Sequence, residues 1–478
     1  RFGNDDSSEA QRWRRRSDTD NLPIDLTGLV LCASAVITVM VVTAFVFDTT
    51  GRGGSLSAPA QNRTHHGQEH IPKHPPSIHL PSDFLDAAAP RLPPPNKRGV
   101  FVRPSHPEVQ LHGRHLLNGS ELVADWSGTR IYLEFSESEH VWVDMLPANL
   151  SRSYSQNERY WCPHYAELFK RMNPPNSPSQ CPYWYDVWEA YVDGDHTATI
   201  YLNYTQSEIR NKAKLSIRGI ATGLERKLRH RLMLYKRTGP KKGGTVVRGI
   251  ILDTGAKIHR QSTHNYIPGR RIEVLGASEE DGECALGKPS DFYATNLESS
   301  LVSYGTILGN YFGADVNYVC MGSEGIVLAG KPESAPYIDY YRRTLYGVRD
   351  VALDWNSSRF KADVVLVANG ITDWGNVKDY KSLLPRFAQA FAELLATIRS
   401  QYPLAWIVLV PWKEQQIEGM HAGLDLYQNR LRSQADDTDA DDRVILQVLD
   451  QSKWPQSYRG CENHPGPLGH KDYAKQIA

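Results

Sequence analysis

Residues 270–282 read Arg-Arg-Ile-Glu-Val-Leu-Gly-Ala-Ser-Glu-Glu-Asp-Gly, an apolar run followed closely by a glycine and a serine. The run Ile272–Leu275 predicts a short strand, and Gly276 permits a sharp turn directly after it. Ser278 would then lie at the carboxyl end of a strand, where open α/β sheets bind their ligands. A hydroxyl there can act as a nucleophile if a base reaches it. The competing interpretation is a helix N-cap, because Ser278 and Asp281 also fit the acidic start of a helix.

Strand and helix patterns alternate along the chain after residue 267. The clearest helix covers about Leu383–Arg399, where apolar side chains share one face. This alternation predicts a mostly parallel sheet with helices on both sides. The predicted strands are Ile272–Leu275, Val316–Cys320, Val364–Val367, Trp406–Val410 and Val444–Leu449.

The region 106–262 has a different pattern, in which short alternating runs are separated by turn residues. Close spacing of such runs predicts a β-sandwich or jelly roll. The basic turn Lys236–Lys242 is interpreted as a solvated hairpin rather than as a polyanion site. The seven predicted strands are Arg130–Phe135, His140–Met145, Val187–Val192, Thr197–Asn203, Lys214–Ile220, Arg231–Lys236 and Thr245–Leu252.

An uncharged apolar segment at residues 26–47 is, at about 22 residues, long enough to cross a bilayer. A cleaved signal peptide is the alternative, but the run is long for one and is followed by a poor cleavage site. Basic residues precede the segment, which predicts a type II single-pass anchor with a cytosolic tail at 1–25. A disordered stalk rich in Pro and His follows at 48–105. The remaining domains, 106–262 and 266–478, would be lumenal or extracellular, in the secretory pathway or at the cell surface.

The cysteines, the overall charge and the glycosylation sequons bear on the compartment and the partners of this protein. Cys162 and Cys181 bracket an aromatic segment and are predicted to pair in an oxidising compartment. Cys284, Cys320 and Cys461 are an odd set whose pairing stays open. Lys+Arg and Asp+Glu balance at 54 each, so no overall charge favours nucleic acid as a partner. The glycosylation sequons that follow the predicted anchor begin at Asn62, Asn118, Asn149, Asn203 and Asn356.

Four polar loops follow predicted strands in the last domain, and a parallel sheet would gather them at one edge. Together they contain a serine, glycine-rich amides, a polar side chain and a histidine. Acyl transfer needs these parts, because the serine attacks, the histidine moves the proton and the amides hold the oxyanion. The loops are Gly276–Ser278, Met321–Gly325, Asn369–Asp373 and Cys461–Pro465.

These four blocks, in this order, resemble the SGNH (GDSL-type) hydrolases, and the preceding region narrows the resemblance to carbohydrate esterase family two. Gly113-Arg114 and Asp125–Gly128 match the opening pattern of that family, and His230 with Lys236–Thr238 matches a later strand. The resemblance covers about residues 108–478. It implies an all-β jelly-roll domain preceding an α/β parallel-sheet hydrolase domain, in proteins that deacetylate plant polysaccharides.

The resemblance also implies roles for residues at matching positions. Ser278 matches the nucleophile and His464 the general base. Glu462 stands two residues before the histidine in place of the usual aspartate, either as a triad member or as a bystander. The turn reads Gly-Ala-Ser with Ala277, where the family usually has Gly-Asp-Ser.

The implied oxyanion donors include the backbone amide of Ser278. In the second block the donor is Ser323, or Gly322 with a one-residue shift. Thr372 stands where the family usually has an asparagine, and losing such a donor can raise the barrier by roughly 3 kcal/mol.

The resulting hypothesis is a membrane-anchored serine esterase that deacetylates a polysaccharide or oligosaccharide through an acyl-serine intermediate. No metal or nucleotide motif is visible, so no cofactor is expected. Two alternatives stay open: an O-acetyltransferase that uses the same serine, and a glycan-binding relative with impaired catalysis.

Overall fold

The computed structural model describes residues 90, 92–148, 186–202, 216–261, 269–328, 337–348, 351–375, 377, 379–434 and 440–478. All of them belong to one compact unit, Ile71–Ala478. The predicted tail, anchor and most of the stalk lie outside the described residues, as do Cys162, Cys181, Asn62, Asn149 and Asn203. No helix within the described ranges has both the length and the apolar character needed to span a bilayer. Asn118 and Asn356, the two described sequons, are exposed.

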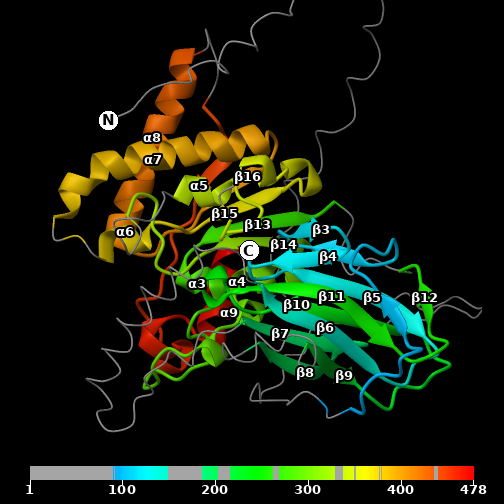
Figure 1. The fold of residues 1–478 in the computed structure, drawn as a ribbon. Coiled ribbons are helices and arrows are strands. Elements are labelled where there is room, and N and C mark those ends of the chain that lie inside the picture. Colours follow the sequence, from blue (N-terminus) through cyan, green and yellow to red (C-terminus); the bar gives the residue numbers. More distant parts are fainter. Residues whose placement is uncertain are drawn as a thin grey trace, which may run out of the picture. The chain divides into compact units, whose positions relative to one another are not determined.

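Two antiparallel sheets form the first part of this unit (Figure 1). One sheet has the order β3-β4-β11-β6-β9, with β1 also paired to β11, and the other has β12-β5-β10-β7-β8, with β2 paired to β5. The strands are β1 (Val100–Val102), β2 (Gln110–His112), β3 (Leu116–Asn118), β4 (Glu121–Ala124), β5 (Arg130–Ser136), β6 (Val141–Ala148), β7 (Asp186–Val192), β8 (Asp195–Leu202), β9 (Ile217–Ala221), β10 (His230–Lys236), β11 (Gly244–Leu252) and β12 (Lys257–His259).

The inward side chains of both sheets build one apolar core, to which β6 contributes Val143 and β10 contributes Leu232. All seven predicted strands of this region are present. The structured region begins earlier than the predicted boundary at 106, because β1 pairs with β11 through Val100 and Leu252. Burial of Val102 in the common core accounts for this pairing, since the side chain is only 2% exposed.

A five-stranded parallel sheet with the order β14-β13-β15-β16-β17 forms the second part. The elements are β13 (Arg271–Gly276), α3 (Ser278–Asp281), α4 (Tyr304–Phe312), β14 (Asp315–Cys320), α5 (Tyr337–Tyr341), β15 (Val364–Val367), α6 (Ile371–Gly375), α7 (Tyr380–Gln401), β16 (Trp406–Leu409), α8 (Glu414–Gln434), β17 (Val444–Leu446) and α9 (Pro467–Ile477). Short 3-10 helices include η1 (Pro240–Lys242) and η7 (Cys461–Asn463).

Successive side chains of the parallel strands point to opposite faces, and each face is covered by helices (Figure 1). Val274 packs with α4 and α9, whereas Leu275 packs in a cluster with residues of α7 and α8. The predicted parallel sheet with helices on both sides is therefore confirmed. The chain passes from β13 to β14 on one side and then to β15 on the other. The carboxyl ends of β13 and β15 thus form a topological switch point, where such sheets bind ligands.

Buried charges join the two parts of the unit. Arg114, which is fully buried, donates to Glu273 on β13 over 3.2 Å. The predicted solvated hairpin at Lys236–Lys242 is wrong, because Lys236 and Lys242 are only 0% and 5% exposed. Lys236 pairs with Asp186 within the antiparallel part over 2.7 Å. The sequence pattern gave no sign that buried carboxylates would enclose these lysines.

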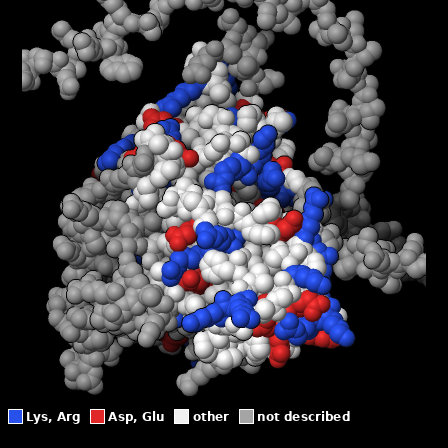
Figure 2. All heavy atoms as spheres, turned by 45° about the vertical axis from the view of Figure 1, so that its right-hand side comes forward, with Lys and Arg blue, Asp and Glu red and all other residues white. Residues whose placement is uncertain are grey.

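Basic and acidic side chains are interspersed on the side of the molecule that carries β5 and β12 (Figure 2). Arg229 and Arg231 both pair with Glu134, at 2.8 Å and 3.0 Å. Arg248 pairs with Asp144 at 3.1 Å. These basic side chains are therefore partly neutralised by neighbouring carboxylates.

Candidate active site

Ser278 lies directly beyond the carboxyl end of β13, as the first residue of α3. The turn before it is held by Glu280, whose Oε2 accepts from the backbone N–H of Ala277 over 2.8 Å. Tyr304 donates its hydroxyl to the other carboxyl oxygen over 3.0 Å. Burial, with the charge of Glu279 adding to it, raises the pKa of Glu280 to about 8. A Cβ on Gly276 would collide with the Glu280 carboxyl group, so the turn requires glycine there.

The hydroxyl of Ser278 faces a histidine from the far end of the chain. Its Oγ lies 2.9 Å from Nε2 of His464. The same hydroxyl lies 3.1 Å from Oε2 of Glu279, a second acceptor that sequence reasoning missed. The N-cap position of α3 is occupied by Ala277, whose methyl side chain makes no capping hydrogen bond. The N-cap interpretation of Ser278 is therefore wrong, whereas the predicted proximity of Ser278 and His464 is observed.

Within the described residues, no acidic side chain makes a hydrogen bond to Nδ1 of His464. Its buried Nδ1 has no hydrogen-bond partner within the described part of the chain. Glu462 is exposed and has a left-handed backbone with φ 49° and ψ 33°. Its Oε1 accepts from the backbone N–H of Tyr293 over 3.2 Å. Glu462 therefore lies near the histidine without bonding to it, which agrees with the bystander interpretation.

Replacing Glu462 with glutamine is accordingly expected to change kcat/KM for 4-nitrophenyl acetate by no more than about three-fold, because an exposed charge contributes little. The same replacement at the exposed Glu418 on α8 is the matched control. A loss of about 10⁴-fold, the size expected when a true triad acid is removed, would instead make Glu462 part of the catalytic group.

The two blocks with candidate oxyanion donors lie on either side of Ser278. β14 pairs with β13 through Gly276 and Cys320, so Gly322 follows the adjacent strand end at the same height as Ser278. Among the described residues, no hydrogen bond uses the backbone N–H of Ser278, Gly322 or Ser323. These amides are therefore available to a ligand. Ser323 has a left-handed φ of 62°.

The third block follows β15 on the other side. Thr372 is half-buried in α6, and no hydrogen bond of its hydroxyl occurs within the described ranges. The adjacent Asp373 accepts from the backbone N–H groups of Ile326, Val327 and Leu328 over 2.7, 2.9 and 2.7 Å. Asp373 therefore fixes the segment that follows the second block, and Thr372 keeps a hydroxyl as the candidate donor.

A buried ion network lies under the second block. The carboxylate of Glu283 occupies the space that a Cβ on Gly322 would take. Lys242 in η1 donates to Glu283 over 3.1 Å and lies 3.3 Å from Glu298. Burial alone would raise the pKa of Glu283, but the charges of Lys242 and Lys241 outweigh it and lower the pKa to about 2. The antiparallel part thus supplies a charge that holds the carboxylate beneath the candidate oxyanion loop.

A disulfide joins the serine segment to the histidine segment. Cys284 is bonded to Cys461, and both residues are fully buried. Cys320 is a free, buried cysteine. The pairing that the sequence left open is thereby assigned. The spacing held a usable signal, because Cys284 follows Ser278 by six residues and Cys461 precedes His464 by three.

One group of potential metal ligands occurs within the described residues. Cys284, Glu462 and His464 place one ligand atom each within 4.8 Å of one another. The sulfur of Cys284 is bonded to Cys461 and offers no thiolate. A metal ligand set requires a deprotonated thiol, so this group does not fit one.

Comparison with known proteins adds to this geometry. A scan against models of known families finds no match. A curated acetylxylan esterase / glucomannan deacetylase of Cellvibrio japonicus (strain Ueda107) is 28% identical over 146 residues. That match covers 30% of this chain and 39% of the relative, so the chain aligns with well under half of the relative's length.

Solved structures match over a larger share. A family two carbohydrate esterase from Cellvibrio japonicus has a TM-score of 0.60 at 17% identity, covering 79% of this chain and 96% of that chain. One from Clostridium thermocellum in complex with cellohexaose has a TM-score of 0.57 at 19% identity, covering 77% and 96%. The chain has the fold of the family two carbohydrate esterases. The resemblance predicted from its sequence motifs is confirmed at this level.

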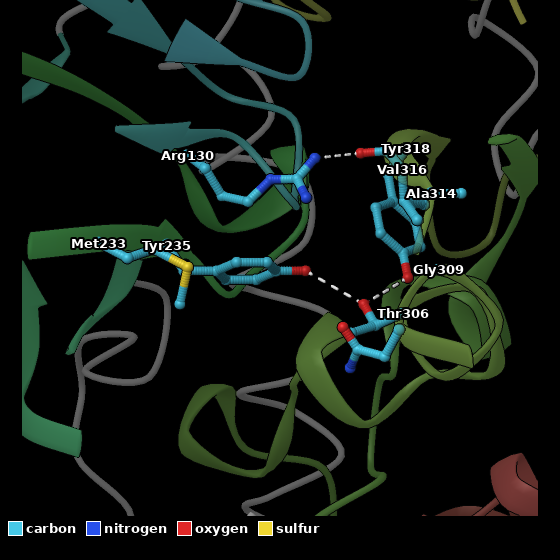
Figure 3. A pocket seen from close by; sticks show the side chains of 9 residues that line it. Arg130, Met233, Tyr235, Thr306, Gly309, Ala314, Val316 and Tyr318 are labelled. Atoms are coloured by element: carbon cyan, nitrogen blue, oxygen red, sulfur yellow. Dashed lines mark hydrogen bonds between the residues drawn. The ribbon is translucent and has the colours of Figure 1, made fainter. Parts of the chain in front are cut away.

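A pocket in this family two fold lies at the seam between the two parts (Figure 3). Arg130 and Tyr235 reach it from the antiparallel strands, and Thr306 and Tyr318 from α4 and β14. The Thr306 hydroxyl lies 3.4 Å from that of Tyr235 and 2.7 Å from that of Tyr318. Its polar groups bond to one another, and neither Ser278 nor His464 lines it. The pocket is therefore part of the packing of the family two fold rather than of the candidate active site.

His470 is a second histidine near the site, fully buried in α9. Neither of its ring nitrogens has a hydrogen-bond partner within the described ranges. Burial, with the charge of His464 adding to it, lowers the pKa of His470 from 6.5 to about 3. Between pH 6.5 and about 3, His470 is protonated in the unfolded chain but neutral in the folded chain. His470 therefore lowers the free energy of unfolding as the pH falls below 6.5.

Replacing His470 with leucine is therefore expected to raise the free energy of unfolding more at pH 5 than at pH 8, by roughly 2 kcal/mol from proton linkage. Urea denaturation at both pH values measures the difference. The same replacement at the exposed His421 on α8 should show no such pH dependence. An equal change at pH 5 and pH 8 for the His470 variant would contradict the prediction.

Proposed function

We propose that this protein is a serine carboxylic ester hydrolase that removes acetyl groups from a polysaccharide or oligosaccharide. One observation carries the proposal: Oγ of Ser278 lies 2.9 Å from Nε2 of His464 at the switch point of a parallel sheet. A serine and a base at this distance form the arrangement needed for nucleophilic catalysis. The curated relative and the structural neighbours support the choice of acetylated carbohydrate as substrate class.

In the first half of the reaction, Oγ of Ser278 attacks the carbonyl carbon of the acetyl ester. The hydroxyl proton passes to Nε2 of His464 as the new C–O bond forms. The backbone amides of Ser278 and of Gly322 or Ser323 donate to the oxyanion. The bond to the sugar oxygen then breaks, and His464 gives its proton to that oxygen.

In the second half, water attacks the acetyl group on Ser278 and gives a proton to Nε2 of His464. The bond between Oγ and the acetyl carbon breaks, acetate leaves, and the proton returns to Oγ. Nε2 must be unprotonated at the start of each half. Glu279 competes for the serine proton in the free enzyme, since its Oε2 lies 3.1 Å from Oγ.

Finer features of the proposal rest on sequence patterns. The uncharged segment 26–47 supports a type II membrane anchor that places the esterase in the lumen or outside the cell. The exposed Asn118 and Asn356 side chains support glycosylation of this part. The two antiparallel sheets with their common core support a jelly-roll domain.

A fluorophosphonate probe tests the proposal directly, because it labels a serine only when a base activates it. Stoichiometric labelling of the full chain at Ser278, lost in the Ser278→Ala variant, is the expected result. Acetate release from acetylated xylan should be lost in the same variant. An unlabelled, folded protein that binds glycans would contradict the proposal and favour a binding module. Faster acetyl transfer to an added sugar than to water would favour the acetyltransferase.

A further inference from the structure

No acidic side chain in the described ranges makes a hydrogen bond to Nδ1 of His464, so another feature is needed to orient the ring. In serine–histidine–carboxylate sites, the carboxylate accepts from Nδ1 and fixes the ring. Here Nδ1 of His464 has no hydrogen-bond partner among the described residues, and Glu462 bonds elsewhere. The backbone that carries the histidine therefore fixes where the ring is attached relative to Ser278.

That backbone is closed into a tight loop. The N–H of His464 donates to the carbonyl of Cys461 over 3.0 Å, and the N–H of Gly460 donates to the carbonyl of His464 over 2.8 Å. The N–H of Cys461 also donates to the carbonyl of Cys284 over 3.2 Å. A Cβ on Gly460 would collide with that same carbonyl. The histidine loop thus lies directly against the backbone of Cys284.

An equally short path joins Cys284 to Ser278. Glu283, the neighbour of Cys284 in the chain, donates its N–H to the carbonyl of Ser278 over 2.9 Å. The carbonyl of Cys284 also accepts from Gly287 over 2.9 Å. From serine to histidine the path is one hydrogen bond, one peptide unit, the disulfide and one more hydrogen bond. Two loops that are 177 residues apart in sequence are joined at this point by a covalent bond.

We propose that the Cys284–Cys461 disulfide is a positioning element that holds His464 against Ser278 in place of a triad carboxylate. This inference rests on the proposed function of the Ser278–His464 pair. Because the bond anchors the loop three residues before the histidine, its loss lets the imidazole move relative to Oγ. A shift of about 1 Å in a reacting group can cost about 10²-fold in rate.

The test compares the Cys284→Ser/Cys461→Ser double variant of the full chain with the unaltered chain. The assay uses conditions in which denaturation curves show both proteins to be folded. There, kcat of the double variant for 4-nitrophenyl acetate should be about 10²-fold lower than that of the unaltered chain, and KM should differ by less than about two-fold. Added imidazole should restore part of the activity in the double variant and in His464→Ala, but not in the unaltered chain. Cys320→Ala, which also removes a buried sulfur, is the matched control and should keep its kcat. Equal kcat in the folded double variant would overturn the proposal.

A readout on the histidine itself separates this inference from the proposed function. In protein labelled with ¹⁵N-histidine, the ring signals of His464 can be assigned with the His464→Ala variant. They should shift in the double variant, whereas those of His112 and His230 in the antiparallel part should not. If the His464 signals shift in the double variant but a fluorophosphonate does not label the unaltered chain, the positioning role of the disulfide is supported and the esterase proposal fails. Unchanged His464 signals would overturn the positioning role whatever the activity.

Discussion

Replacing His464 with alanine is expected to lower kcat/KM for an acetylated oligosaccharide by about 10⁴- to 10⁶-fold. The imidazole is the group that accepts the proton of Ser278, since Nε2 lies 2.9 Å from Oγ. Without it, the alkoxide needed for attack has no positioned base. The loss should appear in kcat, with KM nearly unchanged, because the group acts in the transition state.

The double variant Ser278→Ala/His464→Ala sharpens this prediction. Residues that act as one catalytic unit lose activity together, so the double variant should be no slower than either single variant. The exposed His421 in α8, changed to alanine, controls for loss of a histidine as such. If His464→Ala kept more than about a tenth of the activity, another base would be at work and the assignment of His464 would be wrong.

Replacing Glu273 with glutamine is expected to lower the free energy of unfolding by about 3 to 5 kcal/mol, because it leaves a buried arginine without its counter-ion. Glu273 is fully buried in β13 and accepts from Arg114 over 3.2 Å. It also accepts from Asn317 over 2.7 Å and from the hydroxyls of Tyr341 and Tyr402 over 3.1 and 3.2 Å. A glutamine amide has one acceptor oxygen and two N–H donors, so several of these donors lose their acceptor.

Urea denaturation measures the change in the free energy of unfolding, and two further variants show whether the buried ion pair is its cause. Glu137→Gln removes a carboxylate from an exposed pair with Lys257, whose atoms are 3.9 Å apart, and should cost less than about 1 kcal/mol. Arg114→Leu should cost less stability in the Glu273→Gln background than in the unaltered chain, because the arginine there has already lost its counter-ion. If Glu273→Gln were as mild as Glu137→Gln, the seam would not depend on this ion pair.

Sequence periodicity located some of the longer elements, although it gave no bounds for the 21-residue helix α8. Strand β15 has the bounds that its apolar run indicated, and α7 extends the predicted helix by a few residues at each end. The strands that escaped prediction have only three or four residues, too few for an alternating pattern to emerge; β2 and β12 are examples. Their pairing with β5 depends on a partner strand that is distant in sequence.

The candidate site was predictable where residue type and order carried the information. Ser278 and His464 come from loops whose motifs can be recognised, and the structure brings them together. Burial of Lys242 was not predictable, because it depends on Glu283 and Glu298, which approach only in the folded chain. A basic turn reads the same in sequence whether its partner is water or a buried carboxylate.

The bond between Cys284 and Cys461 closes a ring that contains β14 to β17. A protease that cuts one exposed loop inside this ring leaves a single covalent molecule in which the two halves remain attached. Such a nicked chain keeps Ser278 and His464 on the same molecule, although they are now on different peptide fragments. On a denaturing gel it would run as one species until a reductant divides it into two.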